Sequence, residues 1–166
     1  MTMCSPSKNL VALVESFEHE GQVFIVTKYA KGGNLLSYLN DKGLDCLEEA
    51  RAKHVIRQIA QGVFDMHSNG FVHRDLKHLN IFMGDSSATP KVKVGDLGLT
   101  CRLGQDEMIV KRAGTIAFMA PEIVKDEPSD FKADVWSLGV ITYALICSLV
   151  PFNGATKEET SAKILK

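Results

Sequence analysis

The chain has 166 residues, 45% of them hydrophobic, and a formal net charge of −1, so it is long enough to bury a core as one domain. The balanced charge argues against a nucleic-acid partner or a charged membrane surface. The four cysteines are scattered without a CxxC pair, which gives little support to a metal site or a disulfide framework. We therefore expect a reducing, cytoplasmic setting.

The first third of the chain predicts a β-hairpin followed by helices. Two β-rich runs, residues 10–17 and 23–29, are joined by "EHEG", which is typical of a hairpin. The stretch "GGNLLSYLN" then begins a short helix. From Leu47 to His67, apolar residues recur at spacings of three and four, which predicts a helix with one buried face that the following "NG" ends.

Short strands and more helices follow. Strands are expected at residues 71–72, 81–83 and 91–94, separated by turn residues, and a long loop leads to an apolar helix. That helix contains "VWSLGVITYALICSLV", which is shorter than the ~20 residues that a membrane span needs. We expect a buried core helix there, and no membrane span.

Four polar residues point to phosphate chemistry. Asp75, Lys77 and Asn80 share one short loop between strands, and Asp96 follows a strand about twenty residues later. Each acid alone could be a chance or turn residue, but two adjacent strands would bring all four to one edge. Two acids, an amide oxygen and an ammonium suit a magnesium–phosphate site, because magnesium prefers oxygen ligands and lysine supplies a compact positive charge.

Four motifs in order carry a resemblance to the eukaryotic protein kinases. "HRDLKHLN" resembles their catalytic loop, "DLG" their metal-binding motif, "GTIAFMAPE" the end of their activation segment and "DVWSLG" their buried large-lobe helix. The resemblance implies an α+β fold and a partial protein kinase domain over residues 1–166. Residues 1–30 would be the small-lobe hairpin and the hinge, and residues 31–166 a large lobe truncated at its C-terminal end.

The same resemblance assigns roles in phosphoryl transfer with ATP and Mg²⁺. Asp75 would orient the substrate hydroxyl and accept its proton, and Lys77 would steady the transferred phosphoryl group. Asn80 and Asp96 would hold the magnesium ions, and Asp96 is thereby also part of the cofactor site.

The hinge "VTKYAKGG" would hold the adenine ring. Thr27 would be the gatekeeper, and the backbone of Lys28 and Ala30 would contact the adenine. Phe82 would form the floor of the adenine pocket, and Asn34 completes the nucleotide-binding set.

Further residues are implied by the same motifs. His73 and Leu97 look like packing residues beneath the site, and Asp134 looks like the buried acid that binds the catalytic-loop backbone. Lys77 together with Thr115 is typical of serine/threonine kinases. Two subgroups stay open, because "DLG" with "NIF" is similar to the NIMA-related kinases and "PFNGATKEETSAKILK" to the calcium/calmodulin-dependent group.

Substrate preference and regulation can also be anticipated. Asn34, Leu79 and Ala144 stand where kinases selective for arginine carry acids, so we expect no strong preference for basic peptides.

Residues 101–114 contain no Ser, Thr or Tyr, so we expect no phosphorylation switch there. Asp106 or Glu107 could instead offer a permanent charge to Arg74, or both could be solvated.

Two functions remain open at this stage. One is ATP-dependent phosphoryl transfer to Ser/Thr hydroxyls of protein substrates, by a chain that is part of a longer kinase. The other is a catalytically impaired kinase-like module that binds or regulates partners, because no GxGxxG loop with a V-A-x-K strand precedes the hairpin. A small-molecule phosphotransferase fits poorly, since "GTIAFMAPE" resembles a platform for peptides. The exposed edge of the hairpin offers a site for association.

Overall fold

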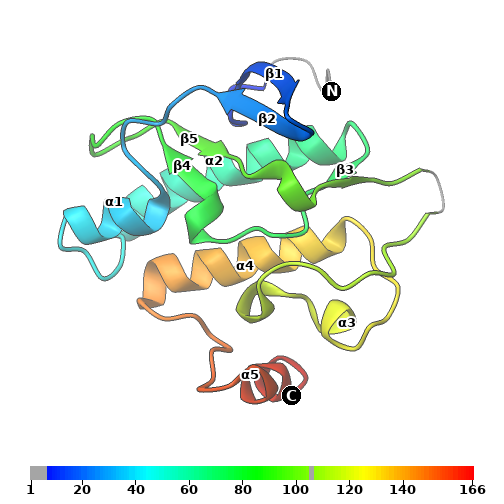
Figure 1. The fold of residues 1–166 in the computed structure, drawn as a ribbon. Coiled ribbons are helices and arrows are strands. Elements are labelled where there is room, and N and C mark those ends of the chain that lie inside the picture. The colour runs from blue at the N-terminus through cyan, green and yellow to red at the C-terminus, as the bar shows by residue number, and fades with distance from the viewer. Residues whose placement is uncertain (1–6, 105–106) are drawn as a thin grey trace.

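The computed structural model describes residues 7–104 and 107–166, and its elements follow the predicted order (Figure 1). The mixture of helices and small strands agrees with the expected α+β class. In chain order, the elements are β1 (Leu13–His19), β2 (Gln22–Thr27), α1 (Leu35–Asp41), α2 (Glu49–His67), β3 (Phe71–Val72), η1 (His78–Asn80), β4 (Ile81–Met83), β5 (Val92–Val94), η2 (Leu97–Leu99), β6 (Cys101–Arg102), η3 (Ile116–Phe118), α3 (Pro121–Val124), α4 (Lys132–Cys147) and α5 (Lys157–Ile164).

Helices α2 and α4 form the centre of the core. In Figure 1, α2 crosses the molecule behind β4 and β5, α4 runs beneath it, and α3 and α5 lie below α4. The buried residues of α2 recur at spacings of three and four, as the sequence predicts. They are Ala52, Val55, Ile59, Gly62, Val63 and Met66. Within residues 7–104 and 107–166, no helix is long and apolar enough to cross a membrane.

Within the described residues, the strands pair in three small antiparallel sheets. They are β1–β2, β3–β6 and β4–β5, and Ile81 opposes Val94 in the last of them. The strands at 71–72 and 81–83 match the prediction, and the third begins at Val92, one residue later than expected. Strand β6 was not predicted. Because β4 and β5 are antiparallel, the start of β4 and the end of β5 meet at one edge, which is where the polar residues gather.

Two element starts differ from the prediction by two residues or more, and a hydrogen bond to another element lies next to each of them. Strand β1 begins at Leu13 instead of residue 10, because the preceding segment bonds to β5. The N–H of Val11 donates to the carbonyl of Val94 at 2.9 Å, and the N–H of Val94 donates to Asn9 at 2.8 Å. Helix α2 begins at Glu49 instead of residue 47, and the N–H of Leu47 donates to the carbonyl of Leu145 in α4 at 2.7 Å.

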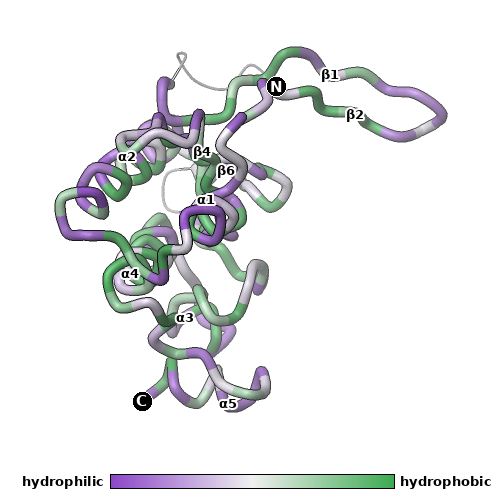
Figure 2. The backbone as a smooth tube through the Cα atoms, turned by 90° about the vertical axis from the view of Figure 1, so that its left-hand side faces the viewer, coloured by the Kyte–Doolittle hydropathy of each residue, from purple (hydrophilic) through white to green (hydrophobic). Residues whose placement is uncertain are grey.

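The β1–β2 hairpin projects from the rest of the molecule (Figure 2). Every residue of both strands is exposed, including Val23 at 72% and Ile25 at 63%. The rings of Phe17 and Phe24 stack on each other with centroids 5.2 Å apart. The strands of the hairpin thus expose apolar surface, whereas Leu10, just before them, packs against the main core.

Candidate active site

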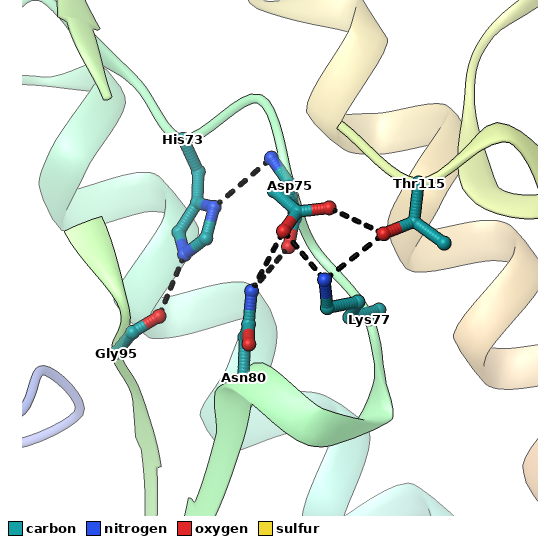
Figure 3. Close-up of polar contacts among 6 residues, drawn as sticks. All are labelled: His73, Asp75, Lys77, Asn80, Gly95 and Thr115. Carbon is teal, nitrogen blue, oxygen red and sulfur yellow. Dashed lines mark hydrogen bonds and ion pairs between the residues drawn. The ribbon is translucent and has the colours of Figure 1, made fainter. Parts of the chain in front are cut away.

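Asp75 lies at the centre of a cluster of hydrogen bonds in the loop between β3 and β4 (Figure 3). Lys77 Nζ donates to Asp75 Oδ2 at 2.7 Å, and Thr115 Oγ1 donates to Asp75 Oδ1 at 2.8 Å. Lys77 Nζ also donates to Thr115 Oγ1 at 2.9 Å. Asn80 Nδ2 donates to the Asp75 carbonyl at 2.8 Å and to its Oδ2 at 3.2 Å. The structure therefore brings the three predicted catalytic residues together, with Thr115 as a fourth member.

The surroundings of Asp75 keep its carboxylate ionised. Burial alone would raise its pKa, but hydrogen bonds from Lys77, Thr115 and Asn80 and the charge of Lys77 together outweigh burial. The pKa of Asp75 therefore lies below its ordinary value. An ionised carboxylate can accept a hydrogen bond from an incoming hydroxyl group, because each oxygen has more than one lone pair.

The backbone of the catalytic loop is held by Asp134 at the start of α4. Its carboxylate is 1% exposed and accepts from the N–H of His73 at 2.8 Å and from that of Arg74 at 3.0 Å. His67 Nε2 lies 2.8 Å from the same carboxylate. Arg74 has a φ of 71°, which L-residues rarely adopt. The bond to Asp134 holds this backbone in place, and this is the role that the resemblance implied.

Asp96 reaches the same edge through Gly95. The N–H of Gly95 donates to the Asn80 carbonyl at 3.0 Å, and its own carbonyl lies 2.9 Å from His73 Nε2. A Cβ atom at Gly95 would lie 2.6 Å from Val11 Cγ2 and 2.9 Å from the Phe82 ring, so only glycine fits without displacement. Asp96 follows with a left-handed φ of 56° and is exposed. Leu97 packs partly against the core.

The donor set at this edge fits a magnesium ion. Because Asn80 Nδ2 is used by Asp75, its amide oxygen points away from that carboxylate, as Figure 3 shows. This oxygen and the Asp96 carboxylate are hard ligands, and magnesium usually takes only one or two protein groups beside substrate phosphates. The described residues contain no cluster of three or more His, Cys, Asp or Glu suited to a metal. A magnesium site that substrate phosphates complete, with Asn80 and Asp96 as its protein ligands, requires no such cluster.

The last residues of the predicted hinge, Gly32 and Gly33, lie next to β4. The N–H of Met83 donates to Gly33 at 2.8 Å, and Asn34 forms a bridge with Phe82. The Asn34 side chain accepts from the N–H of Ser37 at 2.9 Å and caps α1, so its amide oxygen already has a partner.

The backbone that the resemblance assigns to adenine lies beyond the end of β2. The side chains of Thr27 and Lys28 are exposed, and the N–H of Lys28 donates to Ala12 at 2.9 Å. Ala30 is half-buried. The nucleotide-binding roles of Thr27, Lys28, Ala30, Asn34 and Phe82 stay predictions.

Arg74 is bound to the activation segment by a backbone carbonyl. Its Nη2 donates to the carbonyl of Lys111 at 2.6 Å. Glu107 Oε2 instead accepts from the N–H of Gly104 at 2.7 Å, so Glu107 does not supply the charge that one hypothesis gave it. Asp106 lies outside the described residues. Gly114 has a φ of 103° and passes so close to Arg74 that a Cβ would lie 2.3 Å from the Arg74 carbonyl.

Three contacts at the site were not anticipated from the sequence. Thr115 bonds to both Asp75 and Lys77, His67 lies against Asp134, and the ring of His78 contacts Phe118 edge-on with centroids 5.3 Å apart. Each contact joins residues far apart in the sequence. A hydroxyl residue in the "GT" motif was the only signal for any of them.

The similarity of this chain to known proteins agrees with this geometry. The whole chain, residues 1–166, matches the protein kinase domain family. It is 37% identical to the serine/threonine-protein kinase ATG1a of Arabidopsis thaliana over 88% of this chain and 23% of the relative. It is 36% identical to a probable myosin light chain kinase of Dictyostelium discoideum, over 95% of this chain and 40% of the relative. It is 35% identical to the probable serine/threonine-protein kinase 2 of Plasmodium falciparum, over 96% and 31%. The chain spans less than half the length of these relatives, and it belongs to the protein kinase domain family.

Proposed function

We propose that this chain carries the catalytic centre of a serine/threonine protein kinase, which transfers the γ-phosphoryl group of ATP to hydroxyl groups of protein substrates. The observation that supports this most is the Asp75 cluster, in which an ionised carboxylate, the Lys77 ammonium and the Thr115 hydroxyl lie within 2.9 Å of one another. The names of the relatives point the same way.

Each residue of the cluster has a part in this reaction. Asp75 accepts a hydrogen bond from the substrate hydroxyl and orients it toward the phosphorus atom. Lys77 lies beside Asp75, so its positive charge is available to the oxygens of the transferred group. Asn80 and Asp96 would hold magnesium, which supplies charge neutralisation at the phosphates when bound. Thr115 fixes the relative positions of Asp75 and Lys77.

The test is magnesium-dependent phosphate transfer from labelled ATP to a mixture of Ser/Thr proteins by the purified protein. Asp75→Asn should reduce the rate by about 100-fold or more, since general-base positioning contributes 10²–10⁴-fold. Asp41→Asn is the matched control, because Asp41 is exposed at the end of α1, and it should leave the rate unchanged. Transfer that survives Asp75→Asn unchanged would refute the proposal.

A second candidate is a kinase-like module that binds or regulates another chain without transferring phosphate. The observation that favours it is that the hairpin exposes apolar side chains on both strands. Such an edge can pair with another strand. Stable association measured by light scattering, without detectable transfer from ATP, would favour this module over the enzyme.

A further inference from the structure

Helix α4 is apolar on all sides, yet one of its sides lies in solvent. Its sixteen residues include only two charged ones, Lys132 and Asp134, and both are in its first turn. A helix that is apolar all round is normally buried. Nevertheless, Val135 is 56% exposed, Tyr143 45% and Ile146 48%. Residues 7–104 and 107–166 therefore cover only part of α4.

The three exposed residues form one stripe along α4. Successive residues of a helix are turned by ~100°, so Val135, Tyr143 and Ile146 fall within about 80° of one another. The buried residues Val140 and Ile141 lie on the other half of the helix. The stripe is therefore one outer face of α4 and not a scatter of single exposed side chains.

Helix α2 lies antiparallel beside α4. The N–H of Leu47, just before α2, donates to the carbonyl of Leu145 near the end of α4 at 2.7 Å. At the other end of the pair, His67 Nε2 lies 2.8 Å from the carboxylate of Asp134 in the first turn of α4. Figures 1 and 2 both show α4 beneath α2. The two helices thus form one layer.

The apolar surface continues across the line where the two helices meet. Ile56 is turned by only ~20° from His67, so it faces α4. Leu138 is turned by ~40° from Asp134, so it faces α2. Both are half-buried and pack against the main core. Phe64 is turned by ~60° from His67, away from the buried side of α2, and is 64% exposed. The surface therefore runs from Phe64 over Ile56 and Leu138 to the stripe on α4.

The α2–α4 face consists of six apolar side chains from the two helices. They are Ile56, Phe64, Val135, Leu138, Tyr143 and Ile146. The four exposed ones present roughly 400 Å² of surface, given that a whole aromatic side chain has 150–250 Å². Two such faces in contact would remove about 800 Å² of mostly apolar surface, and a polar rim would bring the total to the ~1,200 Å² at which stable interfaces begin. The area is therefore sufficient for a dimer.

The chemistry of the face also suits a second copy of this chain. A two-fold axis brings the same patch of both copies together. None of the six side chains is charged, so this contact opposes no like charges at its centre. Two antiparallel helices from each copy would then pack as one layer on another, an arrangement that buries the apolar stripes of helices.

We propose that two copies of this chain associate through their α2–α4 faces about a two-fold axis. The contact buries the outer stripe of α4, which the single chain leaves in solvent. None of the six residues belongs to the Asp75 cluster or to the β1–β2 hairpin. The dimer is therefore independent of the proposed phosphoryl transfer and of association through the hairpin edge.

The test is the molar mass of the purified protein by light scattering and sedimentation from about 1 to 100 μM, because association depends on concentration. The mass should rise to twice that of one chain. Phe64→Glu and Ile146→Glu should each weaken the dimer by about 30-fold or more, the scale of a residue at the centre of an interface. Both variants should keep the wild-type circular dichroism, since both sites are exposed in the single chain.

The matched control is Ile25→Glu in β2. Ile25 is 63% exposed, almost as much as Phe64, but it lies in the hairpin. This change should leave the dimer intact, because the hairpin is not part of the α2–α4 face.

Hydrogen exchange of the wild type at both ends of the concentration range is a second measurement, and it needs no variant. Exchange should slow with concentration in α2 and α4 and stay unchanged in β1 and β2. A monomer over the whole range would overturn the proposal. A dimer that persists in either folded Glu variant of the face, one that Ile25→Glu dissociates, or slowing confined to the hairpin would overturn it as well.

Discussion

The catalytic loop and the β1–β2 hairpin are held in opposite ways. The loop has little regular structure, yet its backbone bonds to Asp134 of α4, and its side chains bond to Gly95, just after β5, and to Thr115 of the activation segment. The hairpin has regular antiparallel pairing, yet every residue in its strands is exposed. Local stability depends on buried contacts more than on regular backbone pairing, so we expect the irregular loop to be the more rigid region.

The largest expected effect comes from removing the acid that holds the loop. Asp134→Ala leaves the buried N–H of His73 and the partly buried N–H of Arg74 without their partner and removes the contact of His67. It should lower the free energy of unfolding by about 3 kcal/mol or more, as is typical when one member of a buried polar network is lost.

Urea unfolding measures this change. Asp41→Ala, at an exposed site, should change the free energy of unfolding by less than about 0.5 kcal/mol. A loss below ~1 kcal/mol for Asp134→Ala would mean that water replaces the carboxylate, and that the loop is less rigid than the comparison implies.

A smaller effect is expected where the segment before the hairpin meets the loop. In Gly95→Ala, the new Cβ would lie 2.6 Å from Val11 and 2.9 Å from Phe82. Overpacking of this kind costs about 1–3 kcal/mol. Gly139→Ala is the matched control, because apart from its chain neighbours and the nearby backbone of α4 no atom lies within 4 Å of its Cβ position, and it should stabilise the protein by up to ~1 kcal/mol. Equal thermal midpoints for the two variants would show that Val11 moves away from the new Cβ atom without a cost in stability.

The residues of the catalytic loop could be predicted from the sequence, whereas the contacts that hold the loop in place were predicted less well. Asp75, Lys77 and Asn80 share one loop, and Asp96 follows a strand. Local patterns and the motifs were therefore sufficient to predict that these residues meet at one edge of the paired strands. Thr115 lies forty residues from Asp75, and its position depends on the path of the whole activation segment, which no local pattern encodes.

Local patterns also placed the start of the hairpin too early. Leu10 and Val11 have high β propensity, but the backbone hydrogen bonds of Asn9 and Val11 go to Val94 of β5 instead of β2. Propensity indicates extended backbone and does not choose between two possible partners. The same limit applies to β6, whose two residues gain regular structure only by pairing with β3.

A pH effect should appear in the loop. Burial of the His78 imidazole against Phe118 lowers its pKa below the ordinary value of 6.5. The unfolded chain therefore binds a proton more readily than the folded chain in that range. The stability that His78 contributes is full above about pH 6.5 and is lost as the pH falls through the lower folded pKa.

His78→Phe tests this, since it keeps the ring contact and removes the titration. Between pH 7.5 and pH 5, wild type should lose free energy of unfolding relative to His78→Phe in urea titrations. Parallel pH profiles for the two proteins would contradict the assignment.

The smallest effect should come from a substitution in the hairpin, and it tests most directly whether the hairpin is less firmly held than the catalytic loop. Ile25 in β2 is 63% exposed, whereas Ile59 in α2 is fully buried. Ile59→Ala should cost about 2–5 kcal/mol through lost burial and a new cavity. The identical change at Ile25 removes no core contact and should cost only the β propensity of one residue, roughly 0.5 kcal/mol. Urea unfolding of both variants, with hydrogen exchange of the wild-type hairpin amides, checks this. A loss of 2 kcal/mol or more for Ile25→Ala, or slow exchange across β1 and β2, would show that the hairpin is covered in solution, by a second copy or by another partner, and is not the free arm that its exposure indicates.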